Sequence, residues 1–310
     1  MKTRYPVTNW ADYDRARVNR GHLTIRFDEA SIKNHWTPQP PVGRGTPGRY
    51  SDIAIQTCLT LKTLFRLPYR ATEGLLKSLM RLCPLDLPVP DHPPPSRRAA
   101  TLEVQIPRRP RRGPVPVGVD STGLKIFGEG EWKVRQHGVS QRRTWRKIPL
   151  AVDETSKDII GFEVPPADGH DREVFADLLG QVEGDVSQVS ADGSYDPQGC
   201  PAAIAARDAK ATLPPRDGVI LWGNDPPREG LLKEIEAKGR DGGKDDSGTH
   251  RRSLSENRIV RLKQLGDKLR SRCFERPVVE AHIRGVILNT FTYLVGMPQS
   301  VRVGPIASVA

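Results

Sequence analysis

The sequence has no long hydrophobic run and few cysteines, and both shortages exclude classes of protein. A membrane-spanning helix needs roughly 18 or more consecutive apolar residues, and no such stretch occurs. Met1 is followed by polar and aromatic residues, so we expect no signal peptide and a protein that stays in the cytoplasm. The four cysteines lie far apart and form no Cys-x-x-Cys pair, which predicts reduced thiols instead of a zinc site or a disulfide framework.

Positive charge and chain-breaking residues are abundant. The chain has 310 residues, enough for one large domain or two medium ones, and 28 Pro and 28 Gly indicate long connections. Hydrophobic residues make up 36%, low for a compact enzyme but above the level of a disordered chain. The formal net charge of +11 favours a polyanionic partner, because each cation placed on a phosphate releases counterions. Composition alone does not distinguish DNA from RNA or an acidic membrane.

The first part of the chain alternates connecting segments with one helical region. Residues 1–50 are predicted to be an irregular N-terminal arm with only a short helix near Asp28–Lys33. Residues 51–83 predict two short amphipathic helices with a tight joint, which suits a helix-turn-helix-like DNA-binding region or any small helical bundle. Residues 84–114 are rich in Pro and Arg and predict an extended linker, either solvated or laid along a DNA backbone.

Residues 115–296 predict a mixed α/β domain, followed by a flexible tail over 297–310. Strand-like segments are expected at Pro116–Val119 with an extension over Gly123–Phe127, then at Trp145–Val152, Ile159–Val164, Gln188–Ala191 and Ala211–Pro214. Helices are expected at Arg172–Val182, Pro201–Arg207, Ser253–Arg270 and Pro277–Val295.

Two acidic residues follow apolar strands of this domain. Asp120 is expected to end the first strand, and Asp192 follows Val189–Ala191. Carboxylates at the carboxyl ends of adjacent strands project into the crevice where open α/β sheets bind their ligands. Each residue alone is more often a turn former, so the pair needs a third partner to indicate catalysis.

Glu256 is the candidate third carboxylate. At about 100° per residue, Arg252 lies roughly 40° to one side of Glu256 on a helix, and Lys263 lies roughly 20° away. A surface salt bridge between Arg252 and Glu256 is the simpler interpretation, but basic residues far outnumber acids in 251–272. Three carboxylates could hold two Mg²⁺ ions, which prefer such oxygens and stabilise phosphodiester attack, while Arg252 and Lys263 hold the phosphate backbone.

Five segments carry a resemblance to the DDE transposases of bacterial insertion sequences, in particular the insertion-sequence-five family. They are Val119–Lys125, Gly130–Trp132, Arg143–Ile148, Ala191–Asp196 and His250–Glu256, and the likeness extends from about Asn9 to Leu294. The family's Tyr-x2-Arg-x3-Glu-x6-Lys signature maps onto Arg252, Glu256 and Lys263.

This resemblance implies an RNase H-like mixed sheet flanked by helices, with Asp120, Asp192 and Glu256 as both catalytic and metal-binding residues. It implies two Mg²⁺ ions, for which Mn²⁺ can substitute, that support cleavage at element ends and 3′-OH strand transfer. The expected partners are double-stranded DNA, as terminal inverted repeats and target, and further copies of the chain in a dimer or larger assembly. A bacterial, nucleoid-associated location in the cytoplasm follows, without a membrane.

Further cations are candidates for DNA contact, namely Arg251, Arg143, Arg146 and Lys147. Trp145 lies among the last three and either stacks on DNA or packs in the core.

The chain departs from the family pattern at Thr249, Pro149 and Gly243, and Pro93–Pro95 replaces a stretch that usually starts a helix. Two alternatives therefore stay open: a catalytically impaired DNA-binding descendant of a transposase, and an RNase H-like nuclease that cuts without joining.

Overall fold

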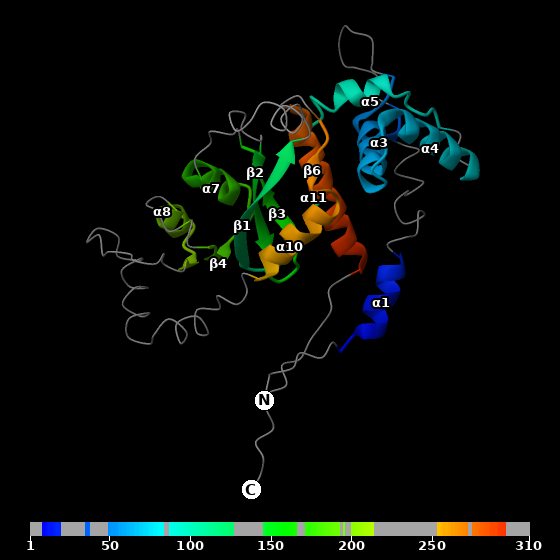
Figure 1. Cartoon of the computed structure of the whole chain (residues 1–310). Coiled ribbons are helices and arrows are strands. Elements are labelled where there is room, and N and C mark those ends of the chain that lie inside the picture. The colour runs from blue at the N-terminus through cyan, green and yellow to red at the C-terminus, as the bar shows by residue number, and fades with distance from the viewer. Residues whose placement is uncertain are drawn as a thin grey trace, which may run out of the picture.

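The molecule combines a mixed β-sheet flanked by helices with a smaller group of N-terminal helices (Figure 1). The computed structural model describes residues 8–19, 35–37, 49–83, 87–126, 145–165, 171–192, 195, 200–213, 253–271 and 275–295. Within these ranges, no helix is both long and apolar enough to span a membrane.

The sheet follows the strand order β3-β2-β1-β4-β5, with β6 paired to the end of β1. Strands β1 to β3 pair antiparallel, whereas β4, β5 and β6 join in parallel. Their bounds are β1 Val115–Ile126, β2 Trp145–Asp153, β3 Ile159–Phe162, β4 Val186–Ser190, β5 Lys210–Thr212 and β6 Lys268–Leu269. This mixed sheet flanked by helices fits the RNase H-like fold that the resemblance implies.

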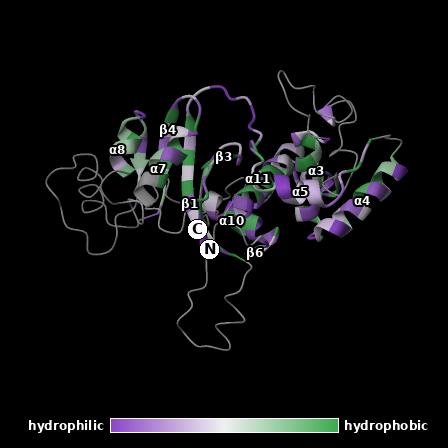
Figure 2. Cartoon of the chain, turned by 90° about the horizontal axis from the view of Figure 1, so that it is seen from above, coloured by the Kyte–Doolittle hydropathy of each residue, from purple (hydrophilic) through white to green (hydrophobic). Residues whose placement is uncertain are grey.

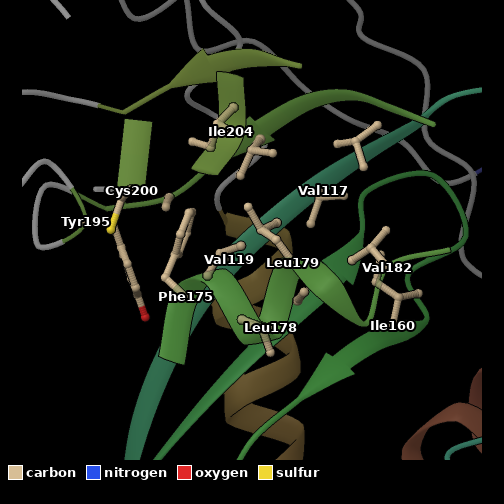
Figure 3. Packing of buried hydrophobic residues seen from close by; sticks show 14 of the residues in the cluster. Val117, Val119, Ile160, Phe175, Leu178, Leu179, Val182, Tyr195, Cys200 and Ile204 are labelled. Carbon is tan, nitrogen blue, oxygen red and sulfur yellow. The ribbon is translucent and has the colours of Figure 1, made fainter. Parts of the chain in front are cut away.

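Helices cover both faces of the sheet, and the alternation of side chains along β1 determines what each face contacts. Val117 and Val119 point to α7 (Asp171–Gly180) and α8 (Cys200–Ala205), in an apolar cluster that Figure 3 shows. Leu124 points to the opposite face, where it packs with α10 (Ser253–Gln264) and α11 (Glu275–Val295). Because successive side chains of a strand alternate, one strand serves two different layers.

The N-terminal helices share their core with the sheet domain. They are α1 (Trp10–Asn19), α3 (Asp52–Leu64), α4 (Tyr69–Leu82) and α5 (Pro93–Arg98). The fully buried Trp36 and Ile55 belong to a cluster that also contains Ile283 and Ile287 of α11. The helical region is therefore packed on α11 rather than being a separate folding unit.

Several predicted elements differ from the structure. The two helices of 51–83 are confirmed, and Ser51 caps α3 by accepting a hydrogen bond from the Ala54 N–H at 3.2 Å. The predicted irregular arm contains α1, while the expected helix at 28–33 lies outside the described residues, as does the tail over 297–310.

The helix expected to reach Arg270 ends at Gln264, because Gly266 adopts φ +148° and the chain then enters β6.

The predicted linker over 84–114 is partly helical and tied to the protein. Its Pro-Pro-Pro run starts α5, where the fixed φ of proline suits the first helical turn and its missing N–H costs nothing. Arg109 forms two hydrogen bonds of 2.7 Å with the buried Asp158, and Arg111 lies 3.4 Å from Asp153. The segment is therefore helical over α5 and tied to the sheet domain by Arg109 and Arg111, while the stretch between α5 and β1 has no regular structure.

Pro149 is accommodated within β2, although β2 is an interior strand. Its carbonyl accepts a hydrogen bond from the Glu163 N–H, just past the end of β3. The N–H and C=O of one residue point to the same side in an antiparallel ladder, so the donor that proline lacks also falls on the β3 side. The pairing with β1 continues on both sides of Pro149.

Candidate active site

Asp120 and Asp192 occupy equivalent positions relative to the neighbouring parallel strands β1 and β4. The pairing of β1 with β4 sets Val117 opposite Val189 and Gly118 opposite Ser190, and each aspartate follows two residues later. Asp120 lies inside β1, which continues to Ile126 in its pairing with β2, and not at the end of a strand as predicted. It nevertheless lies just beyond the end of the parallel pairing, so both carboxylates emerge at the same edge.

Three buried polar groups lie on the same face behind the aspartates. The Ser190 hydroxyl donates a short hydrogen bond to Oε1 of Glu154, whose side chain is 4% exposed. A Cβ atom at Gly118 would lie 3.5 Å from Glu154 Oε1 and 3.7 Å from Cβ of Ser255. Gly118, Ser190 and Ser255 therefore meet on one side of the sheet, and Ser255 belongs to α10.

Glu256 follows Ser255 on the helix that covers this face. The buried side of α10 contains Ser255, Arg258 and Leu262, whereas Glu256 and Lys263 are exposed. The predicted shared stripe of Glu256 and Lys263 is consistent with one continuous helix. Arg251 and Arg252 lie outside the described residues.

The structure thus brings the elements that carry the three acids to one face, but not the acids into one ion-sized cluster. Among the described residues, no group of three or more His, Cys, Asp or Glu side chains is close enough to hold a metal ion. The Asp120 carboxylate is held locally, since its Oδ1 accepts the Ser121 N–H at 2.7 Å. Asp120, Asp192 and Glu256 all offer carboxylate oxygens, which are the ligands that a hard divalent cation prefers.

The predicted DNA-contacting residues occupy varied positions. Arg146 is buried at 8% exposure, Lys147 is half-buried, and Arg143 lies outside the described ranges. Trp145 is 46% exposed, with Nζ of Lys125 5.3 Å from its ring centroid, so the core-packing alternative for this ring is wrong. An exposed ring beside a cation at the end of β1 and β2 is suited to contact nucleic acid.

Glu154 and Arg258 also belong to this face, and no sequence pattern had indicated them. Glu154 follows β2 in the turn before β3, and its N–H donates to Pro116 O at 2.9 Å across the sheet. Arg258 is 2% exposed. Neither residue is part of a motif. Both are charged and would be expected at the surface, and their burial depends on tertiary packing that the local sequence does not predict.

Comparisons with known proteins support the DDE transposase part of the resemblance. A family model described as "Transposase DDE domain" matches residues 112–290, and a second model with the same description matches residues 18–129. Among solved structures, the Drosophila P element transposase strand transfer complex is similar over 62% of this chain and 41% of that chain, with 12% identity. This chain therefore spans less than half the length of that relative, and from a TM-score of 0.27 we infer nothing further.

Proposed function

Because this chain belongs to the DDE transposase family, whose model covers more than half of its residues, we propose that it cleaves DNA at element ends and joins the freed 3′-OH to target DNA. We place it with the transposases of bacterial insertion sequences, of the insertion-sequence-five type. The proposed partners are terminal inverted repeats and target DNA. Since both ends must be held together during joining, a dimer or larger assembly on DNA is expected.

The observation that carries the proposal is the matched placement of Asp120 and Asp192 on one face, with α10 packed over that face. The register places both aspartates two residues past the last β1–β4 pair, and Ser255 fixes the start of α10 against Gly118. Glu256 then lies one residue beyond the contact, on an exposed side of the helix. Small movements of α10 would suffice to change its distance from the aspartates.

Asp120, Asp192 and Glu256 would hold divalent cations, for which we propose two Mg²⁺ ions, with Mn²⁺ as a substitute. Such ions, when bound, activate the attacking oxygen and stabilise charge on the phosphate. The remaining groups of the chain position DNA. Lys263 is exposed on α10 and free to contact a phosphate near Glu256, and we propose the same role for Arg252 and Arg251.

We assign recognition of the element ends to the outer side of α4. Arg70, Lys77 and Arg81 are exposed at spacings of seven and four residues, which places them on one side of this helix. Between them, a Cβ atom at Gly74 would meet nothing within 4 Å. Figure 2 shows α4 at the edge of the molecule farthest from α8, where a duplex has access. A basic second helix with small residues between its cations suits approach to a DNA groove.

The test compares isosteric variants in an assay that scores both nicking and joining of a labelled DNA end. Asp120→Asn, Asp192→Asn and Glu256→Gln should each lower both activities at least about a hundredfold, because each removes a charge from the metal-binding set. Asp177→Asn provides the control, since Asp177 is exposed on α7 at the opposite face. End binding should persist in all four variants.

Retained joining by Glu256→Gln would overturn the assignment of this residue. Nicking without joining by the unaltered protein would replace the proposed transposase with a nuclease.

A further inference from the structure

A small cavity lies where the N-terminal helices meet the α10–β6 turn and α11. Its volume is about 180 Å³, well above the ~15 Å³ that one water needs. Its lining contains five cations against two acids, namely Lys62, Arg66, Lys268, Arg270 and Arg284 against Asp267 and Glu280. The wall of the cavity therefore carries a formal excess of three positive charges.

Lys62 is largely buried and forms no ion pair with a described residue. Its side chain is 9% exposed, and burial lowers the pKa of its ammonium group. Its Nζ lies 4.8 Å from the ring centroid of Tyr69, but no hydrogen-bond acceptor for it exists among the described residues. A buried ammonium without an acceptor is costly, and a bound anion would offset that cost.

Arg284 forms the floor of the cavity and is held rigidly. This side chain is 2% exposed and donates to Gly266 O, to Lys268 O at 2.7 Å and to Glu280 Oε1 at 2.9 Å. Its Nε has no partner within the described part of the chain. Glu280 accepts hydrogen bonds from Arg284 and from the Arg270 N–H, each at 2.9 Å, and its nearby charge only partly offsets the effect of burial on Lys62.

The rim of the cavity joins two parts of the protein. Arg66, at the end of α3, donates to Gln264 O at 2.6 Å, and Arg270 donates in return to Arg66 O. These contacts hold the basic groups of α3 beside those of the α10–β6 turn. The hydrogen bonds that hold these arginines in place are accepted by backbone carbonyl groups. Carbonyl groups carry no net charge, so the positive charge of the cavity wall is not neutralised.

We propose that this cavity is a phosphate-binding site and that it takes one backbone phosphate of DNA, outside the catalytic face. The choice of DNA rests on the proposed transposase function. Lys268 pairs with Lys125, five residues past Asp120 on β1, which corresponds to roughly 17 Å along the strand. With the duplex axis running along β1, the axial rise of about 3.4 Å per nucleotide would place the bound group about five nucleotides from the cleaved bond.

The first experiment measures the melting temperature of the full chain against inorganic phosphate at constant ionic strength. Phosphate should raise it for the wild type and for Lys210→Met, an exposed lysine on β5 that serves as the matched control. Lys62→Met should lose the increase and should melt at or above the wild type without phosphate, because an uncompensated charge has been removed. Arg270→Gln, at an exposed position, repeats the test should Lys62→Met fold poorly. No increase in the wild type, or an increase retained in both variants, would overturn the site.

The second experiment scores binding, not cleavage, to end duplexes with one methylphosphonate at successive positions. A neutral linkage about four to six nucleotides from the cut should weaken wild-type binding roughly fivefold to tenfold, and should leave Lys62→Met unaffected. If phosphate raises the melting temperature but no single linkage matters, the DNA assignment fails and free phosphate is the ligand. Neither readout needs turnover, so a protein that binds the ends but fails to cleave or join them would produce neither negative result, and the phosphate experiment does not depend on DNA at all.

Discussion

The two faces of the sheet are built from the same strands, but the α10 side presents polar groups beside its own apolar cluster. On the α7–α8 side, Val117, Val119 and Val189 enter a cluster of apolar side chains. On the α10 side, the alternate residues Gly118, Asp120 and Ser190 are polar or lack a side chain. A strand alternates its side chains with a period of two, so one face can supply stability while its reverse presents polar groups. The polar positions of the α10 side can therefore change chemically while the apolar clusters on both faces hold the fold.

Placing a charge on the apolar α7–α8 face should lower the free energy of unfolding more than any of the other changes below. Val117 is 0% exposed, and Val117→Asp would bury a carboxylate without a partner, at a cost of at least about 4 kcal/mol. The variant should be largely unfolded by circular dichroism at 25 °C.

Asp120→Asn, three residues along the same strand on the other face, provides the control. It should keep its melting temperature within a few degrees while DNA cleavage is lost. Cooperative melting of Val117→Asp near the wild-type temperature would contradict the assigned roles of the two faces.

Cavity-forming substitutions test whether the covering helices differ as the faces do. Leu178 on α7 and Leu262 on α10 are both 0% exposed, and each change to Ala should lower the free energy of unfolding by about 2–5 kcal/mol. Denaturant titration measures that loss. The joining activity per folded molecule should fall in Leu262→Ala but not in Leu178→Ala, because α10 positions Glu256 and α7 positions no proposed catalytic residue. Equal joining activity in both variants would show that α10 has no special role.

Much of this arrangement was predictable from local patterns, because alternation and helical spacing are properties of adjacent residues. The predicted strands contain Val117 and Val189, the two aspartates were predicted directly after these strands, and the helix of Glu256 was identified by its spacing. Tertiary contacts were not predictable. The burial of Glu154 depends on Ser190, which lies 36 residues away, and the α5 helix begins with three prolines whose sequence suggested an extended linker.

Two glycines provide a matched and smaller test of the faces. A Cβ atom at Gly161 would lie 2.8 Å from the carbonyl oxygen of Leu178, which is backbone and does not move easily. Gly161→Ala should therefore destabilise the protein by about 1–3 kcal/mol through overpacking against α7. At Gly118, on the polar face, the nearest atom would be 3.5 Å away, an ordinary contact. Gly118→Ala should change the free energy of unfolding by less than about 1 kcal/mol. Denaturant titration of both variants measures these changes in the free energy of unfolding. Equal losses in the two variants would refute the proposed difference in packing between the faces.

The smallest expected effect concerns pH and a carboxyl at the edge of the packed sheet. Glu163 follows β3 and accepts a hydrogen bond from Gln181, and burial is the main cause that raises its pKa above the ordinary value of 4.5. A carboxyl whose pKa is higher in the folded state favours folding while it is protonated, so its contribution is complete below about pH 4.5 and is lost as pH rises through the folded pKa. Glu163→Gln keeps the amide-sized shape without titrating. The free energy of unfolding, measured from pH 4 to 7, should therefore decline less with rising pH in the variant than in the wild type. Glu183→Gln, at an exposed position on the same side, should follow the wild type. Identical slopes for Glu163→Gln and wild type would show that burial at this edge of the sheet does not affect the titration of Glu163.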